Sequence, residues 1–260
     1  MIIQVLISTM NQQDIKKLIK EMNTKSAVVV NQVTENIIVP KDIRTSLITA
    51  ISIKERGLSK SRNRAIKAAT AEVCLIADDD MYYVDSYENI VTEAYVRYPD
   101  ADIITFYVDH EDPNHATKRQ KEGRLSLLQT MKTSSCQISF RRSSILSKDL
   151  TMDETFGTGT DKYMGEESIF LFDCHKKGLK VYHVHDRIAV LKKENESTWF
   201  EGYNKKYFIV KGAVFYRMSK LLCPFLIIQF SIRKKHLFND VSLLKSIRLM
   251  ASGAYNEAQL

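Results

Sequence analysis

The sequence predicts an α/β protein built on a mostly parallel sheet with helices on both faces. Two observations support this expectation. Short apolar runs alternate with helix-patterned segments through residues 1–200, and polar residues gather where several of these runs stop. Such alternation is typical of a doubly wound sheet, which binds ligands at the carboxyl ends of its strands. A chain of 260 residues can bury one sizeable core, so we expect one domain over 1–200 and a helical extension over 201–260.

The individual elements follow from apolar periodicity along the chain. Residues 2–7 form a nearly continuous apolar run, which is typical of a buried strand. In residues 14–22 the spacing of Ile15, Leu18 and Ile19 gives one apolar face, which indicates a helix. By the same reasoning we expect strands at 27–30, 73–77, 102–108, 136–140 and 179–184, and helices from 59, over 85–98, over 166–177 and within 207–232.

Glycine is missing from the start of the chain, and this excludes several nucleotide-binding classes. No glycine precedes Gly57, so the first strand carries neither a dinucleotide-binding fingerprint nor a phosphate loop. The same absence disfavours a sugar nucleotidylyltransferase, which needs a glycine-rich first loop.

Three adjacent carboxylates follow the buried run 73–77. Asp78, Asp79 and Asp80 repel one another, so holding them together is unfavourable unless a cation or a set of donors compensates them. Asp78 and Asp80 share one side of an extended segment and suit Mg²⁺ or Mn²⁺, which keeps other positions for water and phosphate oxygens. Such an ion would stabilise a diphosphate leaving group. The alternative is a solvated turn, the commoner fate of an acidic run.

Polar residues also follow the first two expected strands. Thr9 comes after the run 2–7, and Asn31 comes after the run 27–30. Because ligands bind at the carboxyl ends of the strands, these two residues stand where a nucleotide base would lie. For each of them the alternative of a plain polar loop residue stays open.

A second acidic pair opens the helix expected over 166–177. Glu166 and Glu167 follow a glycine-rich segment and fall in the first helical turn, where the macrodipole favours anions. This effect alone would account for two surface glutamates. His183 and His185 end the strand expected over 179–184, where an imidazole can reach a metal or serve as a hydrogen-bonded surface group.

Two ordered motifs carry a resemblance to a known family. The first is Gly57-Leu58-Ser59 with Ser61-Arg62-Asn63, then a helix rich in small residues, a hydrophobic strand and Asp-x-Asp at 78–80. The second is Gly-Glu-Glu at 165–167, after a glycine-rich loop and before a helix that ends in Lys-x-Gly. Together they resemble family 2 glycosyltransferases over roughly residues 1–200. The resemblance implies the GT-A fold, a Rossmann-like, mostly parallel twisted sheet with helices on both faces.

The resemblance also implies roles for the residues of the first motif. In that family the Asp-x-Asp pair binds a divalent metal and the donor sugar-nucleotide. Asp78 would lie near the donor sugar or ribose, and Asp80 would bind Mn²⁺ or Mg²⁺, with Asp78 as a further ligand and Asp79 in the donor site. Arg62 and Asn63, at a helix start, would lie beside the same site.

In the second motif, the family's second acid is the general base that deprotonates the acceptor hydroxyl. Here that residue would be Glu167, with Glu166 as the alternative. The family usually has Asp at this point, one methylene shorter, which matters because the reacting atoms must meet within hydrogen-bond distance. A His is common at the next strand end, before a Ser/Thr-rich segment. His185 and Ser197-Thr198-Trp199 match this pattern loosely, so His185 is a candidate metal ligand.

The implied function is an inverting, metal-dependent transfer of a sugar, with a UDP-linked hexose as the expected donor and its base beside Thr9 and Asn31. The nucleoside diphosphate would leave one face of the anomeric carbon as the acceptor hydroxyl arrives at the other. The expected acceptor is a lipid-linked or oligosaccharide chain in bacterial surface or capsular polysaccharide assembly.

The basic character of the chain belongs to its C-terminal tail. Residues 201–260 carry ten Lys or Arg against three acidic residues, which accounts for the whole net charge of +7. The apolar run 221–230 lies between Lys220 and the basic triplet 233–235, and it is far shorter than the about 20 apolar residues that span a bilayer. We expect an interfacial anchor that faces anionic headgroups. The alternative is a core-packing helix with solvated basic ends.

The expected location is cytoplasmic, peripheral on the inner face of the cell membrane. No N-terminal signal is recognisable, and the four widely spaced cysteines indicate reduced thiols. Two rival functions are a non-catalytic membrane-associated scaffold of the same fold and a nucleic-acid binder, which the basic tail suggests. Neither rival explains why acidic clusters lie at strand and helix ends, and the sequence has no recognised nucleic-acid-binding motif, so we expect no nucleic-acid partner.

Overall fold

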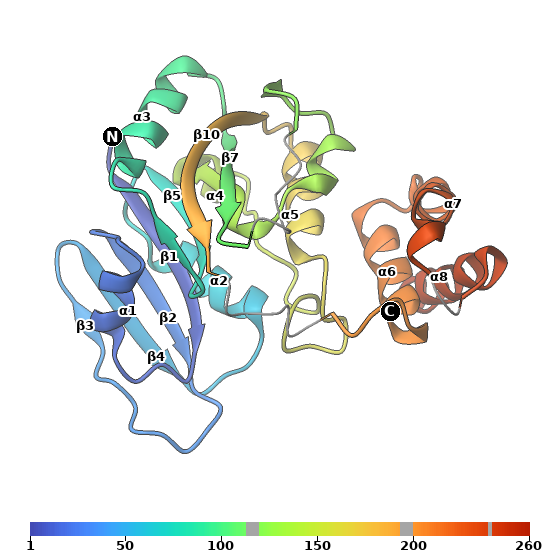
Figure 1. Ribbon diagram of the computed structural model, residues 1–260, viewed down its shortest axis with the longest axis horizontal. Helices are drawn as coiled ribbons and strands as arrows, with labels where there is room; N and C mark the ends of the chain where they lie inside the picture. The colour runs from blue at the N-terminus through green and yellow to red at the C-terminus, as the bar shows by residue number, and fades with distance from the viewer. Residues whose placement is uncertain (113–119, 193–199, 239–240) are drawn as a thin grey trace.

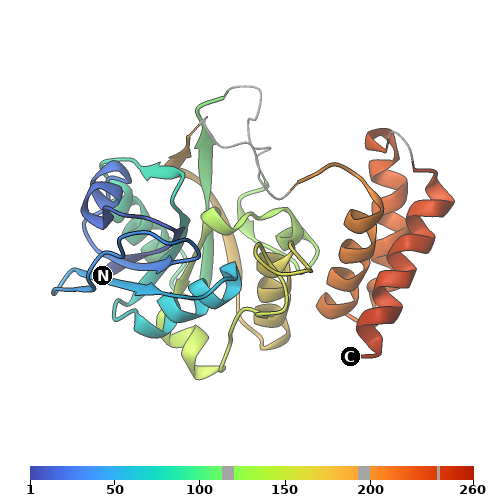
Figure 2. The same ribbon diagram turned by 90° about the horizontal axis from the view of Figure 1, so that it is seen from below.

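The computed structural model describes residues 1–112, 120–192, 200–238 and 241–260. In this part of the chain one mixed sheet carries helices on both faces, and three C-terminal helices stand beside it (Figures 1 and 2). The strands are β1 (Ile3–Met10), β2 (Ala27–Gln32), β3 (Ile43–Arg44), β4 (Ile48–Ile53), β5 (Val73–Asp78), β6 (Met81–Tyr83), β7 (Ile103–His110), β8 (Gly123–Arg124), β9 (Ile138–Arg141) and β10 (Val181–Leu191). The helices are α1 (Ile15–Glu21), α2 (Leu58–Ala68), α3 (Tyr87–Arg97), α4 (Arg142–Ser147), α5 (Glu166–Lys176), α6 (Lys205–Met218), α7 (Cys223–Lys234) and α8 (Leu243–Ala258).

The central strands run parallel and end at one edge of the sheet. The strand order is β3-β4-β2-β1-β5-β9-β7-β10-β6, with β8 paired to β10. β4, β2, β1 and β5 are parallel neighbours, and so are β7 and β10, whereas β9 runs antiparallel between β5 and β7. In this register Ser8 of β1 lies opposite both Val30 and Asp78. The predicted fold class is confirmed, and the carboxyl ends of the parallel strands meet as expected.

Several strands differ from the sequence-based expectation. The short strands β3, β6 and β8 were not predicted. β4 was not among the predicted strands, because its residues mix Ile with Thr, Ala and Ser and stay mostly half-buried near the sheet margin. β10 does not stop at 184 but continues to Leu191, through register shifts between His183 and Ala189. These shifts carry the strand past the polar residues 185–187. Because these residues interrupt the apolar run, a hydrophobicity pattern does not predict that the strand continues.

Each face of the sheet has its own apolar core. α1 and α3 cover one face, where Leu18 belongs to the same core as strand residues such as Leu75. α2, α4 and α5 cover the other face, where Phe170 joins the core that contains Ile76. Leu75 and Ile76 are neighbours on β5 but belong to different cores, because side chains alternate across a strand. The strand is therefore buried on both sides, as its continuous apolar run predicts.

A third core joins the C-terminal helices to α5. Ile169 and Phe172 of α5 are fully buried in a cluster with side chains of α6, α7 and α8, including Phe215. Gly165, which precedes α5, has φ +90°, and a Cβ there would lie 2.7 Å from both methyl groups of Val214 on α6. A side chain at this position would push α6 away. The inner side of the tail is thus a core-packing face, the alternative left open by the sequence.

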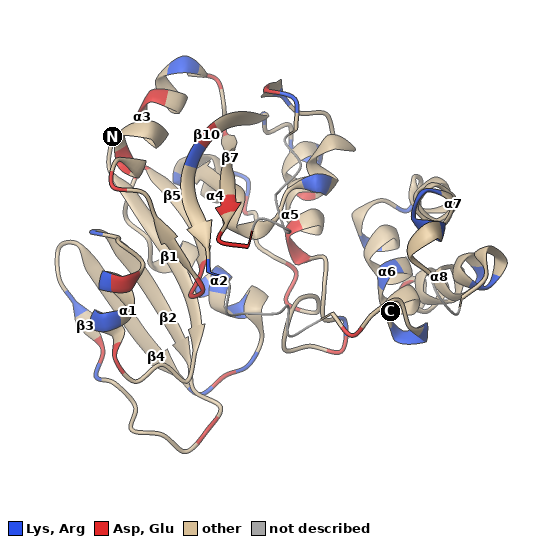
Figure 3. Ribbon diagram, in the orientation of Figure 1, with Lys and Arg blue, Asp and Glu red and all other residues tan. Residues whose placement is uncertain are grey.

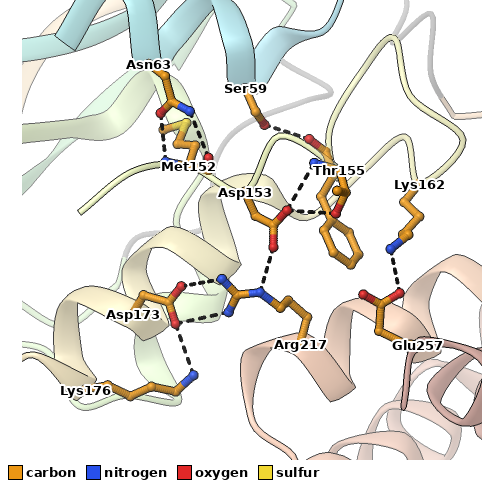
Figure 4. A network of polar contacts seen from close by, with 11 residues as sticks. Ser59, Asn63, Met152, Asp153, Thr155, Lys162, Asp173, Lys176, Arg217 and Glu257 are labelled. Carbon is orange, nitrogen blue, oxygen red and sulfur yellow. Dashed lines mark hydrogen bonds and ion pairs between the residues drawn. The ribbon is translucent and has the colours of Figure 1, made fainter. Parts of the chain in front are cut away.

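Ion pairs reinforce this attachment (Figure 4). The guanidinium of Arg217 on α6 lies between Asp153, at 2.7 Å, and Asp173 of α5, at 2.9 Å. Lys162 pairs with Glu257 of α8 at 2.6 Å. The tail therefore holds both α5 and the loop over 153–162. A boundary between two domains at residue 200 stays a prediction.

Candidate functional site

A cavity of about 710 Å³ opens at the carboxyl ends of the parallel strands. Its wall combines the ends of β1, β5 and β7 with the start of α2, the start of α5 and one side of α6. Segments far apart in the sequence therefore converge on one space. Seven of the predicted site residues line it: Thr9, Arg62, Asp78, Asp79, Asp80, Glu166 and Glu167.

Arg62 lies at the centre of this arrangement and is 1% exposed. Its Nη2 donates to Oδ1 of Asp78 at 2.8 Å, and its Nη1 donates to Oε1 of Glu166 at 3.0 Å. Burial by itself would lower the pKa of Arg62, but the two carboxylates outweigh burial and raise the pKa above its usual value. One buried guanidinium thus joins the acidic turn after β5 to the first turn of α5.

The start of α2 is held by hydrogen bonds from polar side chains. The amide of Gln32 brackets Gly57, donating to its carbonyl at 3.0 Å and accepting from its N–H at 3.2 Å. The hydroxyl of Ser61 donates to that of Ser8 at 2.8 Å. Ser59 donates to the carbonyl of Phe156 in the glycine-rich loop (Figure 4). Small residues at these positions let the helix approach β1 closely, and this places Arg62.

The acidic turn after β5 is held from two sides. The hydroxyl of Thr9 donates to Oδ2 of Asp79, and the carbonyl of Asp80 accepts from the N–H of Lys192 at 2.8 Å. Burial raises the pKa of Asp79, against the hydrogen bond from Thr9. The turn is therefore anchored to the ends of β1 and β10.

The donor set on the cavity wall fits a divalent ion. Asp78 and Asp80 offer carboxylate oxygens, the ligand type that Mg²⁺ and Mn²⁺ prefer, and an ion there would keep positions for water and phosphate oxygens. Within the described ranges, no group of three or more His, Cys, Asp or Glu is arranged to hold a metal by itself. A bound substrate would have to complete the coordination.

The two glutamates at the start of α5 have different surroundings. Glu166 is 6% exposed and is engaged by Arg62. Glu167 lines the same cavity, and burial, followed by the charge of Glu166, raises its pKa to about 7. Arg62 and Lys211 oppose this rise. A carboxyl group with a pKa close to neutral can take up a proton at physiological pH.

Three predicted site residues lie outside the cavity wall. Asn31 is fully buried and bridges the backbone of Gln12 with hydrogen bonds of 2.9 and 3.0 Å. Asn63 donates to the carbonyl of Met152 at 2.9 Å and accepts from its N–H at 2.8 Å (Figure 4). Both amides therefore hold backbone segments near the site.

His185 is the third of these residues. It lies in the middle of β10, where its Nε2 contacts the carbonyl of Gln120 at 2.6 Å. Because β10 runs on to Leu191, the strand end that reaches the cavity is six residues further along, and Leu191 lines it. The segment Ser197-Thr198-Trp199, matched loosely with His185, lies outside the described residues.

Several cavity residues were not anticipated. His110 is the last residue of β7, and the rule that ligands bind at strand carboxyl ends would have found it had the strand been extended by two residues. Tyr163 follows the glycine-rich loop, while Tyr207 and Lys211 come from α6. No local motif marks the α6 residues, because their place depends on how the tail packs.

Comparisons with known proteins bear on the fold and on the enzyme class. A model of glycosyl transferase family 2 matches residues 34–151, a range that contains Arg62 and the acidic turn but ends before Glu166. No curated protein shows significant sequence similarity to the chain.

Solved structures show the same fold at low sequence identity. TarS 1–349 from S. aureus in complex with UDP-GlcNAc matches with a TM-score of 0.62 and 16% identity over 91% of this chain and 73% of that chain. The mannosyltransferase PcManGT from Pyrobaculum calidifontis in complex with GDP-Man and Mn²⁺ matches with a TM-score of 0.51 and 13% identity over 97% and 69%. The predicted GT-A fold is confirmed by these structures, and the predicted enzyme class, glycosyltransferase, by them together with the family match.

Replacing Arg62 by Met should lower the free energy of unfolding by about 3–5 kcal/mol, because Asp78 and Glu166 would lose their shared buried counter-charge. Urea denaturation at neutral pH measures this. Arg64→Met is the matched control: the Arg64 side chain is 47% exposed and pairs with Glu55, so its loss should change stability by less than about 1 kcal/mol. Equal effects of the two substitutions would contradict the central role of Arg62.

Proposed function

We propose that the chain is an inverting, metal-dependent glycosyltransferase that moves a hexose from a UDP-sugar to a lipid-linked or oligosaccharide acceptor. One observation carries the proposal: a single cavity holds both the acidic turn 78–80 and Glu167, and the Arg62 ion pairs join Asp78 of that turn to Glu166, the neighbour of Glu167. A donor diphosphate and an acceptor hydroxyl need these two kinds of group close together. A non-catalytic scaffold would need neither.

The donor would bind on the side of the acidic turn. Thr9, Arg62, Asp78 and Asp79 border this part of the cavity. TarS is recorded with UDP-GlcNAc and with UDP, and PcManGT with GDP-Man, and these nucleotide sugars support a nucleotide-linked donor here. Asn31 and Asn63 would act on the donor only through the backbone segments that they hold.

Asp80, with Asp78, would hold Mn²⁺ or Mg²⁺ in this site. The Mn²⁺ in the PcManGT structure supports a divalent metal as part of the reaction. When bound, such an ion neutralises the negative charge of a diphosphate leaving group. Arg62 already engages one oxygen of Asp78, so Asp80 would be the principal ligand.

Glu167 would act as the general base. Its carboxylate takes the proton of the acceptor hydroxyl while that oxygen forms a bond to the anomeric carbon. The bond from this carbon to the nucleoside diphosphate breaks on the opposite face, so the configuration inverts and the proton stays on Glu167. Glu166 is less suited to this role, because its carboxylate is engaged by Arg62.

The acceptor would enter from an adjoining cavity of about 590 Å³. This second cavity shares Arg56, Thr158, Gly159 and Tyr163 with the first. Its other charged lining residues are of both signs, which suits a polyhydroxylated chain: Lys60, Lys206, Glu154, Asp161 and Glu201.

The outer side of α7 supports a membrane-bound acceptor and a peripheral location on the inner face of the cell membrane. Phe225, Ile228 and Ile232 are between 49% and 62% exposed, and their spacing puts them on one stripe of the helix. Leu221, just before the helix, is 89% exposed. Lysine and arginine residues flank the stripe (Figure 3). An apolar stripe with basic flanks is typical of an interfacial helix. No helix in the described part of the chain is long and apolar enough to cross a bilayer.

A UDP-hexose with Mn²⁺ should raise the melting temperature of the wild type, because a ligand that binds only the folded state stabilises it. EDTA or Asp80→Ala should abolish the shift, whereas Asp186→Ala, which removes an acid paired with Arg97 on the surface, should leave it intact. A screen of nucleotide sugars with Mn²⁺ or Mg²⁺ makes the measurement. No shift with any donor would favour the scaffold.

The pH dependence of transfer should report Glu167. Because this base is active only when ionised and burial raises its pKa to about 7, kcat/KM should rise with pH through about 7 and then level off. Glu167→Gln should lower kcat about 100- to 10,000-fold. The control Glu93→Gln, an exposed residue of α3, should keep full activity. A flat wild-type profile between about pH 5.5 and 8 would contradict the assignment.

Binding to anionic vesicles should depend on the stripe of α7. Phe225→Glu should weaken binding to vesicles that contain phosphatidylserine by about tenfold or more, because it removes roughly 2 kcal/mol of apolar burial and adds a negative charge. Ile38→Glu changes an 88% exposed residue outside the tail and should have no effect. Co-sedimentation measures both, and equal behaviour of the two variants would argue against the membrane contact.

A further inference from the structure

Lys211 brings a positive charge from the C-terminal helices into the catalytic cavity. It lies on α6, and it lines the same cavity as Glu167. The other cations of that wall are Arg62, which is engaged by Asp78 and Glu166, and Arg56, which is exposed. Lys211 is therefore the half-buried cation of this wall that is left to compensate a charge on Glu167, and its helix packs on the start of α5, where Val214 meets Gly165.

The surroundings of Lys211 keep it in place without neutralising it. Its Nζ lies 5.2 Å from the ring centre of Phe215 and 5.7 Å from that of Phe230, distances that suit a cation against aromatic faces. Burial lowers its pKa, the charge of Glu167 raises it, and Arg233 and Lys234 on α7 lower it. A nearby carboxylate stabilises the charged form of an ammonium group that lies among aromatic rings and like charges.

The charge balance around Glu167 requires such a partner. Glu166 is the adjacent residue of α5 and repels it, and burial penalises its ionised form. Arg62 of α2 and Lys211 of α6 are the cations that favour ionisation. Arg62 already pairs with Asp78 and Glu166. The cation left to compensate the charge of Glu167 is therefore Lys211 of α6.

We propose that Lys211 acts on the reaction through Glu167, whose negative charge it compensates from the α6 side of the cavity, so that the C-terminal helices form part of the catalytic site. This inference rests on the proposed role of Glu167 as general base. The proton from the acceptor hydroxyl goes to Glu167 and not to the lysine. The attachment of α6 through Arg217 and Val214 then has a catalytic consequence, since it fixes the lysine.

The test compares Lys211→Met and Lys211→Arg with the wild type. The control is Lys205→Met, which removes an exposed lysine six residues earlier on the same helix, outside both cavities. Circular dichroism and urea denaturation first establish that each variant folds. Two readouts follow: the pH profile of kcat/KM for sugar transfer, and the titration of the Glu167 carboxyl by NMR with ¹³C-labelled glutamate, assigned from the Glu167→Gln spectrum.

The expected result is an upward shift of both the acidic limb and the Glu167 titration by about one pH unit in Lys211→Met, the usual effect of losing a nearby opposite charge. Lys211→Arg should restore most of the shift, and Lys205→Met should show none. An unchanged titration in Lys211→Met would overturn the proposal, as would a raised donor KM with an unchanged pH profile. If the wild type transfers no sugar, the proposed function fails, and the NMR titration alone still decides the interaction of Lys211 with Glu167.

Discussion

The ion pairs of Arg62 are the constraint on which the rest of the site depends. A guanidinium this deeply buried is stable only with carboxylates beside it, and here one comes from the end of β5 and the other from the start of α5. The two acidic clusters would repel each other without it. A single residue of α2 therefore sets the spacing between the turn 78–80 and the pair 166–167, and this spacing allows both to border one cavity. The hydrogen bonds of Gln32, Ser59 and Ser61 matter because they place the helix that carries Arg62.

The C-terminal helices complete this arrangement. Their inner side shares an apolar core with α5, and their ion pairs reach the loop that leads into it. The same packing carries Tyr207 and Lys211 to the cavity wall. The outer side leaves apolar residues of α7 exposed. One set of helices thus has a core-packing face and a solvent-facing apolar stripe, so the two alternatives that the sequence left open for the tail concern different sides of it.

The sequence alone predicted those parts of the fold and site that depend on local pattern. Continuous apolar runs identified β1, β2 and β5, and the strand-end rule led to Thr9 and to Asp78, which do line the cavity. Residues whose hydrogen-bond or packing partners lie far away in the sequence were predicted less well. The polar side chain of Asn31 follows the same rule, yet it satisfies the backbone of Gln12, and this contact requires the fold to be known. Lys211 gives no local signal at all, since only tertiary packing brings α6 to α5.

Position 167 holds Glu, whereas the resemblance leads one to expect Asp. The longer side chain is consistent with a site that depends on the packing of the C-terminal helices. Glu166 turns to Arg62, so the adjacent carboxylate needs its own compensation away from that ion pair. An extra methylene lets a carboxylate extend further from its helix than Asp allows, and the facing helix α6 offers Lys211. A shorter acid would keep its charge closer to Glu166 and farther from the opposite wall. If Glu167 is the general base, a longer acid at 167 and a lysine on α6 would complement each other, and the chemistry proposed for α5 would depend on the packing of a residue 44 positions further along the chain.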